Sequence, residues 1–126
     1  MKNILISGKV IADKYNQIGE FLDEAWINYF KNKKINLINC SMLTNQLLKK
    51  LTISGVILTG GNDLYKIKKK RFNKIRDSKD SKLFNFAISN NIPVLGVCRG
   101  FQFIASKMGG TINKKKGHVK KKHILK

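Results

Sequence analysis

Two short apolar runs, each followed at once by a glycine turn, constrain the fold of this chain most. They are SGVILT at residues 54–59 and IPVLGV at residues 92–97. Each run has the length of a strand and is apolar enough to be buried on both faces. Strands of that kind occur almost only in parallel sheets that helices cover on both sides. The sequence therefore predicts an α/β domain.

The rest of the chain supplies the other elements of such a domain. Strands are expected at residues 2–7, 35–38, 54–59 and 92–97. Helices are expected at 18–30, at 43–51 with Thr44 as N-cap, from Asp80 or Ser81 to 88, and at 101–108. Residues 65–80 are expected to form a basic, polar loop. This alternation predicts an open three-layer sandwich with a mostly parallel sheet, in one domain over residues 1–126.

The strong positive charge at first suggests a nucleic-acid partner. The net charge is +19, but only Arg71, Arg76 and Arg99 among the 26 basic residues are arginines. The densest basic runs, 66–71 and 114–122, contain no aromatic residue, although Tyr65 precedes the first. Specific nucleic-acid sites usually combine arginine with aromatic side chains. We therefore expect solvated lysine-rich loops and no specific nucleic-acid partner.

The apolar segments also bear on location. No run approaches the roughly 18 apolar residues that a membrane span needs, and the apolar part of the N-terminus is too short for a secretion signal. The two cysteines, Cys40 and Cys98, have no disulfide-framework spacing. We expect a cytoplasmic protein with reduced thiols, no membrane contact, no cofactor and no metal.

The turn after the fourth expected strand carries the strongest chemical signal. It reads Gly96-Val-Cys98-Arg-Gly100, and an amphipathic helix is expected to follow. A nucleophile between a strand and a helix needs a tight, strained turn, and small residues two before and two after it relieve the crowding. A helix N-terminus also favours a thiolate. Cys98 is therefore a candidate nucleophile; the alternative is a small buried residue.

A second glycine turn, Gly60-Gly61, follows the third expected strand. Carboxyl ends of parallel strands meet at one edge of the sheet, so both turns are expected there. The backbone N–H of Arg99 and one from the Gly60-Gly61 turn could together bind an oxyanion. Cys40 lacks such surroundings, and we expect it to be buried.

These residues together resemble a known family. LTGGNDL at 58–64, GVCRGFQ at 96–102 and the later Gly109-Gly110 are similar to the class I, triad-type glutamine amidotransferases, most of all their gamma-glutamyl hydrolase branch. The Arg76-Asp77 pair also resembles that branch. The resemblance covers nearly the whole chain in order, and it implies a flavodoxin-like fold.

The resemblance also implies roles for individual residues. Cys98 would attack the gamma-carbonyl of a glutamine or gamma-glutamyl group and form a thioester that water hydrolyses. The backbone amides of Gly61 and Arg99 would bind the oxyanion. Gly60 and Gln102 would bind the small-molecule gamma-glutamyl substrate; the alternative for Gln102 is an exposed helix residue.

One part of the family pattern has no match in this sequence. The family's catalytic histidine and its acidic partner lie far downstream of the cysteine, and His118 and His123 follow Gly109-Gly110 too closely to correspond to them. They resemble a segment near the site, and the alternative is solvated histidines among lysines. The chain is thus expected to be the N-terminal part of a triad hydrolase, inactive or incomplete on its own.

Partners and substrate follow from the same resemblance. A synthase domain or a complementing C-terminal half would be its protein partner. Residues 13–26 resemble the opening of family members from bacterial surface-polysaccharide gene sets, which favours a gamma-glutamyl intermediate of that biosynthesis as substrate. The alternative for Leu22 and Trp26 is the core stripe of a helix. A non-catalytic α/β relic or binding module is the alternative function.

Overall fold

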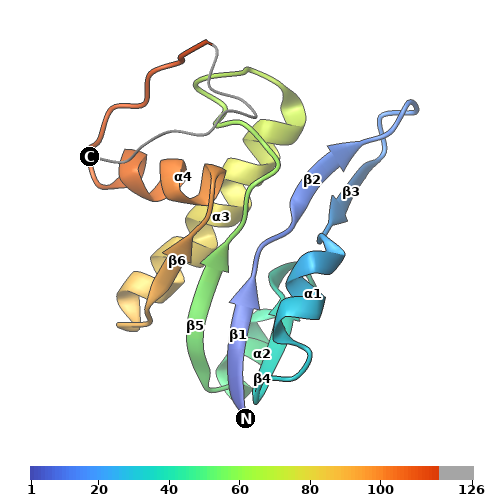
Figure 1. The fold of residues 1–126 in the computed structure, drawn as a ribbon, viewed down its shortest axis with the longest axis vertical. Helices are drawn as coiled ribbons and strands as arrows, with labels where there is room; N and C mark the ends of the chain where they lie inside the picture. The colour runs from blue at the N-terminus through green and yellow to red at the C-terminus, as the bar shows by residue number, and fades with distance from the viewer. Residues whose placement is uncertain (117–126) are drawn as a thin grey trace.

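The computed structural model describes residues 1–116 and places a four-stranded parallel sheet at the centre of the molecule (Figure 1). Its strands are β1 (Lys2–Ile6), β4 (Ile35–Asn39), β5 (Ile53–Leu58) and β6 (Val94–Gly96). The order across the sheet is β4-β1-β5-β6, and all three pairings are parallel. The predicted α/β architecture with a mostly parallel sheet is confirmed.

Helices flank this sheet on both faces. They are α1 (Glu24–Phe30), α2 (Asn45–Lys50), α3 (Arg71–Ser89) and α4 (Arg99–Lys107), with a 3-10 turn η1 (Cys40–Met42). Thr44 caps α2 as predicted, because its Oγ1 accepts a hydrogen bond of 3.2 Å from the backbone N–H of Leu47. Gly109, with φ of 89°, follows the end of α4.

The core lies between the sheet and α3 with α4. Its fully or nearly buried apolar residues are Leu5, Val56, Leu58, Leu64, Leu83, Phe84, Ala87 and Phe103. Phe84 and Phe103 meet edge to face with 6.3 Å between ring centroids, which joins the two helices. Ile4 and Ile57 alternate with these strand residues and face the other side, where they line a hollow with Phe30 of α1.

The predicted helix over 18–30 is wrong in its first half. Residues Lys9–Ala12 and Ile18–Phe21 form an antiparallel hairpin, β2 and β3, which projects beyond the carboxyl end of β1 (Figure 1). The Asp13 carboxylate accepts two 2.8 Å hydrogen bonds, from the N–H groups of Tyr15 and Gln17, and these close the turn. A helical spacing of apolar residues could not reveal this turn.

The predicted loop over 65–80 is also wrong, because α3 begins at Arg71 and not at Asp80 or Ser81. The helix buries a regular face, but the N-terminal half of that face consists of the polar residues Asn73, Arg76 and Asp80. Apolar periodicity is blind to a buried polar face, so the first half of the helix went unpredicted. Asp80 is a fully buried residue inside the helix and caps nothing.

None of the helices that the structure describes in residues 1–116 has both the length and the apolar character that a membrane crossing requires.

Candidate active site

The two glycine turns lie against each other at the carboxyl edge of the sheet. The backbone N–H of Val97 donates a 2.9 Å hydrogen bond to the carbonyl of Leu58, the last residue of β5. Cβ geometry shows how closely the turns pack, since a Cβ built on Gly60 would lie 2.9 Å from the Cβ of Cys98. The structure therefore brings Gly60, Gly61, Cys98 and Arg99 together, as the topology of a parallel sheet predicts.

Cys98 occupies a backbone conformation that side-chain-bearing residues rarely adopt. Its φ is 52° and its ψ is −115°, and it is the N-cap residue of α4. Its backbone carbonyl accepts a 3.1 Å hydrogen bond from the N–H of Gln102. The residue is exposed, so the alternative of a buried small residue does not hold. Strain of this kind tends to collect at functional sites.

Glycines 96 and 100 make this turn sterically possible. A Cβ on Gly96 would stand 2.6 Å from the carbonyl carbon and oxygen of Gly100. A Cβ on Gly100 would stand 1.9 Å from the carbonyl oxygen of Leu58. Both are backbone contacts that no side-chain movement relieves, so α4 can leave the sheet this steeply only where both positions lack a Cβ.

A pocket of about 320 Å³ opens beside Cys98. Its lining residues come from both glycine turns, the hairpin and the start of α1: Lys9, Phe21, Leu22, Asp23, Trp26, Thr59, Gly60, Gly61, Val97 and Cys98. The interpretation of Leu22 and Trp26 as a core stripe is wrong, because no residue of α1 is buried and both residues line this pocket. Sequence reasoning missed Lys9, Phe21 and Asp23, since their role depends on the hairpin.

Of the two residues predicted to bind the oxyanion, Gly61 lines this pocket and Arg99 does not. Gly61 has φ of 98°, and a Cβ there would come 2.8 Å from the Cδ of Lys9. The backbone nitrogen of Arg99 lies 3.8 Å from the Cβ position of Gly60. The Arg99 side chain points elsewhere, because it is buried and bound to Asp77 and Asp80. Only the backbone of Arg99 therefore lies near the Gly60-Gly61 turn.

Arg76 lies beneath the Gly60-Gly61 turn and is completely buried. Its guanidinium donates hydrogen bonds to the carbonyl oxygens of Thr59 (2.7 Å) and Gly60 (3.1 Å). Burial lowers the pKa of Arg76, and the Asp80 carboxylate at 3.1 Å opposes that change. The resemblance singled out the Arg76-Asp77 pair, but no sequence pattern indicated that Arg76 supports the turn from below.

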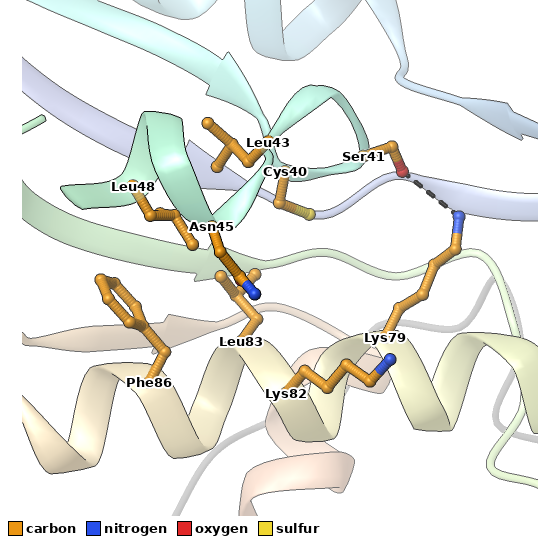
Figure 2. A pocket seen from close by; sticks show the side chains of 9 residues that line it. All are labelled: Cys40, Ser41, Leu43, Asn45, Leu48, Lys79, Lys82, Leu83 and Phe86. Carbon is orange, nitrogen blue, oxygen red and sulfur yellow. Dashed lines mark hydrogen bonds between the residues drawn. The ribbon is translucent and has the colours of Figure 1, made fainter. Parts of the chain in front are cut away.

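Cys40 lies in different surroundings. It lines a separate cavity of about 270 Å³ between the η1–α2 segment and α3, with apolar side chains including Leu43 and Leu83 around it (Figure 2). Burial, followed by the nearby carboxylates of Glu20 and Asp80, raises the pKa of the Cys40 thiol to about 12. A thiol with such a pKa is a poor nucleophile at neutral pH. Cys40 is partly buried, so the expected burial is met only in part.

Comparison with known proteins decides the family. The profile of Peptidase C26 matches residues 33–124, which include the strands β4, β5 and β6, both glycine turns and α4. The chain belongs to the Peptidase C26 family. The resemblance to class I glutamine amidotransferases is thereby confirmed.

Curated relatives agree with this assignment. The chain is 30% identical over 119 residues to a gamma-glutamyl-CDP-amidate hydrolase of Campylobacter jejuni, covering 92% of the chain and 60% of that protein. It is 33% identical over 69 residues to a putative glutamine amidotransferase of Schizosaccharomyces pombe, covering 48% of the chain and 27% of that protein. A glutamine-hydrolysing GMP synthase component of Methanococcus aeolicus is 34% identical over 62 residues, covering 49% and 26%.

Three other residues singled out from the sequence are not seen at this pocket. Gln102 is exposed on the first turn of α4 and is not among the residues that line the pocket beside Cys98. Its role in substrate binding stays a prediction. His118 and His123 lie outside the described residues.

Proposed function

We propose that this chain carries the nucleophilic half of an enzyme that hydrolyses a gamma-glutamyl amide bond. The Sγ of Cys98 attacks the gamma-carbonyl carbon, the carbon–nitrogen bond breaks, and the amine leaves with a proton. Water then attacks the resulting thioester and releases glutamate and the thiol. The observation that carries this proposal is an exposed cysteine in a strained strand-to-helix turn at a pocket, in a chain of the Peptidase C26 family.

Stabilisation of the oxyanion is assigned to backbone N–H groups of Gly61 and Arg99. Support comes from the close approach of the two turns, with the Arg99 nitrogen 3.8 Å from the Gly60 Cβ position. Backbone donors are held rigidly by the fold, so they need little reorganisation as charge develops on the substrate oxygen. Glycine at 60 leaves the space beside Cys98 in which the glutamyl group would lie.

The substrate that we favour is a gamma-glutamyl intermediate of bacterial surface-polysaccharide biosynthesis. The Campylobacter jejuni relative is named for a gamma-glutamyl-CDP-amidate, and its similarity extends over 92% of this chain. The pocket offers groups suited to a leaving part of that chemistry. Trp26 and Phe21 present ring surfaces to a base, and Lys9 presents a cation to phosphate. Glutamine itself would use none of these three side chains.

Turnover also needs a general acid and base, which the resemblance assigns to a histidine with an acidic partner downstream. The chain spans about 60% of the length of the Campylobacter jejuni relative. We propose that the corresponding remainder of such a protein, in the same polypeptide or as a complementing C-terminal half, supplies this histidine. The 126 residues alone would then form the thioester from an amide slowly, because the acid is missing, and would hydrolyse it more slowly still.

One face of the sheet offers a docking surface for this remaining part of the protein. On the face that carries α1, Ile4, Ile35, Ile57 and Leu95 line an open apolar hollow of about 300 Å³, and Leu95 is 56% exposed. Among the described residues no strand pairs with the outer edge of β6. Parallel sheets are normally covered on both faces, so this face suits the complementing half.

The remaining assignments concern an alternative partner, location and an alternative function. The GMP synthase relatives favour a synthase domain as an alternative partner that would take up the released ammonia. We place the protein in the cytoplasm, where its nucleotide-type substrate would be available. A non-catalytic binding module is the alternative function, and the strained, exposed Cys98 argues against it.

Trapping of the thioester tests the proposal. The purified chain is mixed with a gamma-glutamyl p-nitrophenyl ester, whose p-nitrophenolate leaves without an acid, then quenched in acid and analysed by intact-protein and peptide mass spectrometry. A gamma-glutamyl adduct on Cys98 that is lost in Cys98→Ala, and kept in Cys40→Ala, supports it. A chain that forms no adduct, although Cys98 is readily alkylated by iodoacetamide, would favour the binding module.

A further inference from the structure

One buried charge network joins the two turns of the candidate site. Arg76 and Asp80 lie on successive turns of α3 and are both fully buried. Asp80 Oδ2 accepts from Arg76 Nε at 3.1 Å and from Arg99 Nη1 at 2.6 Å. Asp77 accepts from Arg99 through Oδ1 and from the N–H of Tyr65 through Oδ2. Two arginines and two aspartates thus form a network that is neutral as a whole.

The acceptors of Arg76 belong to several segments around the pocket. Nη2 donates to the Ser7 hydroxyl at 2.9 Å, just after β1, and to the Thr59 carbonyl after β5. Nη1 donates to the Gly60 carbonyl and, at 3.1 Å, to Oδ1 of Asn62. The amide of Asn62 in turn holds the backbone N–H and carbonyl of Val10 in β2, at 2.9 and 2.8 Å.

These bonds fix the direction of the peptides in the Gly60-Gly61 turn. In a trans peptide the carbonyl and the following N–H point in opposite directions. Because Arg76 holds the carbonyls of Thr59 and Gly60, the N–H groups of Gly60 and Gly61 point away from α3. Without a side chain on either glycine, only these peptide contacts define the orientation of the turn.

The other end of the network holds the Cys98 turn. Arg99 directly follows Cys98, and its side chain is 2% exposed and bound to Asp80 and Asp77. Asp80 therefore links the residue beneath the Gly60-Gly61 turn to the residue beside Cys98. Removing one partner from a buried network leaves a charge without compensation, so loss of Asp80 would disturb both turns.

We propose that Arg76, Asp80 and Arg99 are positioning residues that set the distance and orientation between the Gly61 N–H and the Cys98 thiol. The inference rests on the proposed function in one respect, that Gly61 and Arg99 donate to an oxyanion. Neither arginine side chain touches the substrate. The network acts through the backbone, and its loss would impair attack on a carbonyl more than attack that develops no oxyanion.

Two electrophiles distinguish a loss of oxyanion binding from a general loss of thiol reactivity. Attack of Cys98 Sγ on p-nitrophenyl acetate passes through an oxyanion, breaks the ester carbon–oxygen bond and expels p-nitrophenolate, which leaves with the electron pair and needs no acid. Alkylation by iodoacetamide displaces iodide and needs only an accessible thiolate. Each rate is measured on the purified 126-residue chain, with the Cys98→Ala rate subtracted because lysines also react with the ester.

Asp80→Asn is expected to slow acylation by about tenfold, because the oxyanion donor is displaced and not removed. Alkylation should stay within about twofold of the wild-type rate. Lys82→Ala, an exposed position on the same helix, is the matched control and should change neither rate. Two outcomes for the folded Asp80→Asn protein would show that the network is merely structural and that the proposal is wrong. In one, neither rate differs from that of the wild type; in the other, both rates fall by the same factor.

A milder variant covers the case in which Asp80→Asn does not fold. Asp77 is partly exposed, at 29%, and Asp77→Asn leaves the Arg76–Asp80 pair intact. We expect a selective loss of acylation of about threefold, smaller because one of the two Arg99 anchors remains. No selective loss in this variant would overturn the proposal. Neither reagent carries a gamma-glutamyl group, so failure of the proposed substrate would not alter these results.

Discussion

Gly60 lies directly against Cys98, with only 2.9 Å between the place where a Cβ would stand on Gly60 and the Cβ of the cysteine. Real Cβ atoms essentially never come this close, so any side chain at position 60 forces one of the two turns to move. The neighbouring contacts are to backbone, with the Val97 carbonyl at 3.7 Å and the Arg99 nitrogen at 3.8 Å. The space at Gly60 is therefore part of the site.

Gly60→Ala should slow acylation of Cys98 by about 100-fold, because the added methyl displaces the thiol or the oxyanion donors by a fraction of an ångström to an ångström. Single-turnover release of p-nitrophenolate measures it. Gly19→Ala is the control, since a Cβ there would make only an ordinary 3.6 Å contact with Ile11. Equal acylation rates for both variants would show that the Gly60 contact does not matter to the chemistry.

Gly100→Ala should destabilise the whole domain. Its Cβ would penetrate to 1.9 Å from the Leu58 carbonyl oxygen, so α4 and β5 would have to separate. Forced overpacking of this kind costs about 1–3 kcal/mol or more of the free energy of unfolding. Urea unfolding followed by circular dichroism measures the change. Gly109→Asn should cost far less, because Gly109 faces open space and Asn tolerates a positive φ.

The two cysteines should differ in labelling. At pH 8 we expect iodoacetamide to label Cys98 at least about tenfold faster than Cys40, since alkylation requires the thiolate. The Cys40 thiol has its pKa raised from 9.0 to about 12. Peptide mapping after brief labelling gives both rates, and labelling in urea should equalise them. Equal rates in the folded chain would contradict the assignment of Cys40 as a partly buried, inert thiol.

The raised pKa of Cys40 also makes the free energy of unfolding depend on pH. Because its pKa is raised on folding, the unfolded chain loses this proton first, starting near pH 9.0. The stability gained by keeping Cys40 neutral is thus fully present below that pH and is lost as the pH rises toward 12. Urea unfolding of wild type and Cys40→Ala should accordingly converge or cross as pH increases from 8 to 11. A constant difference between them would argue against the shift.

Some elements of the fold could be predicted from the sequence, and others could not. Apolar runs and glycine spacing located β5, β6 and both turns of the site, because burial and tight turns restrict residue choice locally. The hairpin went unpredicted, since its turn rests on the Asp13 side chain and its apolar residues mimic helical spacing. The first half of α3 was missed because its buried residues, such as Arg76, are polar.

The candidate site likewise contains residues that the sequence predicted and residues that only the structure revealed. The elbow pattern indicated Cys98 and Arg99, the resemblance added Gly61, and the topology of a parallel sheet predicted that the two glycine turns meet. The pocket wall made by Phe21 and Trp26 depends on how the hairpin and α1 fold back, which no local pattern encodes. The links from Arg76 to Ser7 and Thr59 join residues 69 and 17 positions apart, and only the structure reveals them.

The last prediction concerns turnover, which we expect to require more than these 126 residues. Alone, the chain should release glutamate from gamma-glutamyl compounds at a rate close to that of Cys98→Ala after the first thioester forms. Hydrolysis of the thioester needs a base to activate water, and departure of the amine needs an acid. Addition of a polypeptide that corresponds to the remaining 40% or so of the Campylobacter jejuni relative, to which the resemblance assigns the catalytic histidine, should restore multiple turnovers.

A substitution on the exposed face of the sheet tests whether the added polypeptide acts by binding there. Leu95→Asp places a charge on the exposed apolar hollow and should abolish the gain from the added polypeptide, because a buried unpaired carboxylate costs several kcal/mol. It should leave iodoacetamide labelling of Cys98 unchanged, since Leu95 does not line that pocket. Ile11→Asp, at an exposed apolar residue of the hairpin, is the matched control and should keep the gain. Multiple turnovers by the chain alone, lost in Cys98→Ala but kept in His118→Ala and His123→Ala, would mean that another group within these 126 residues acts as the base.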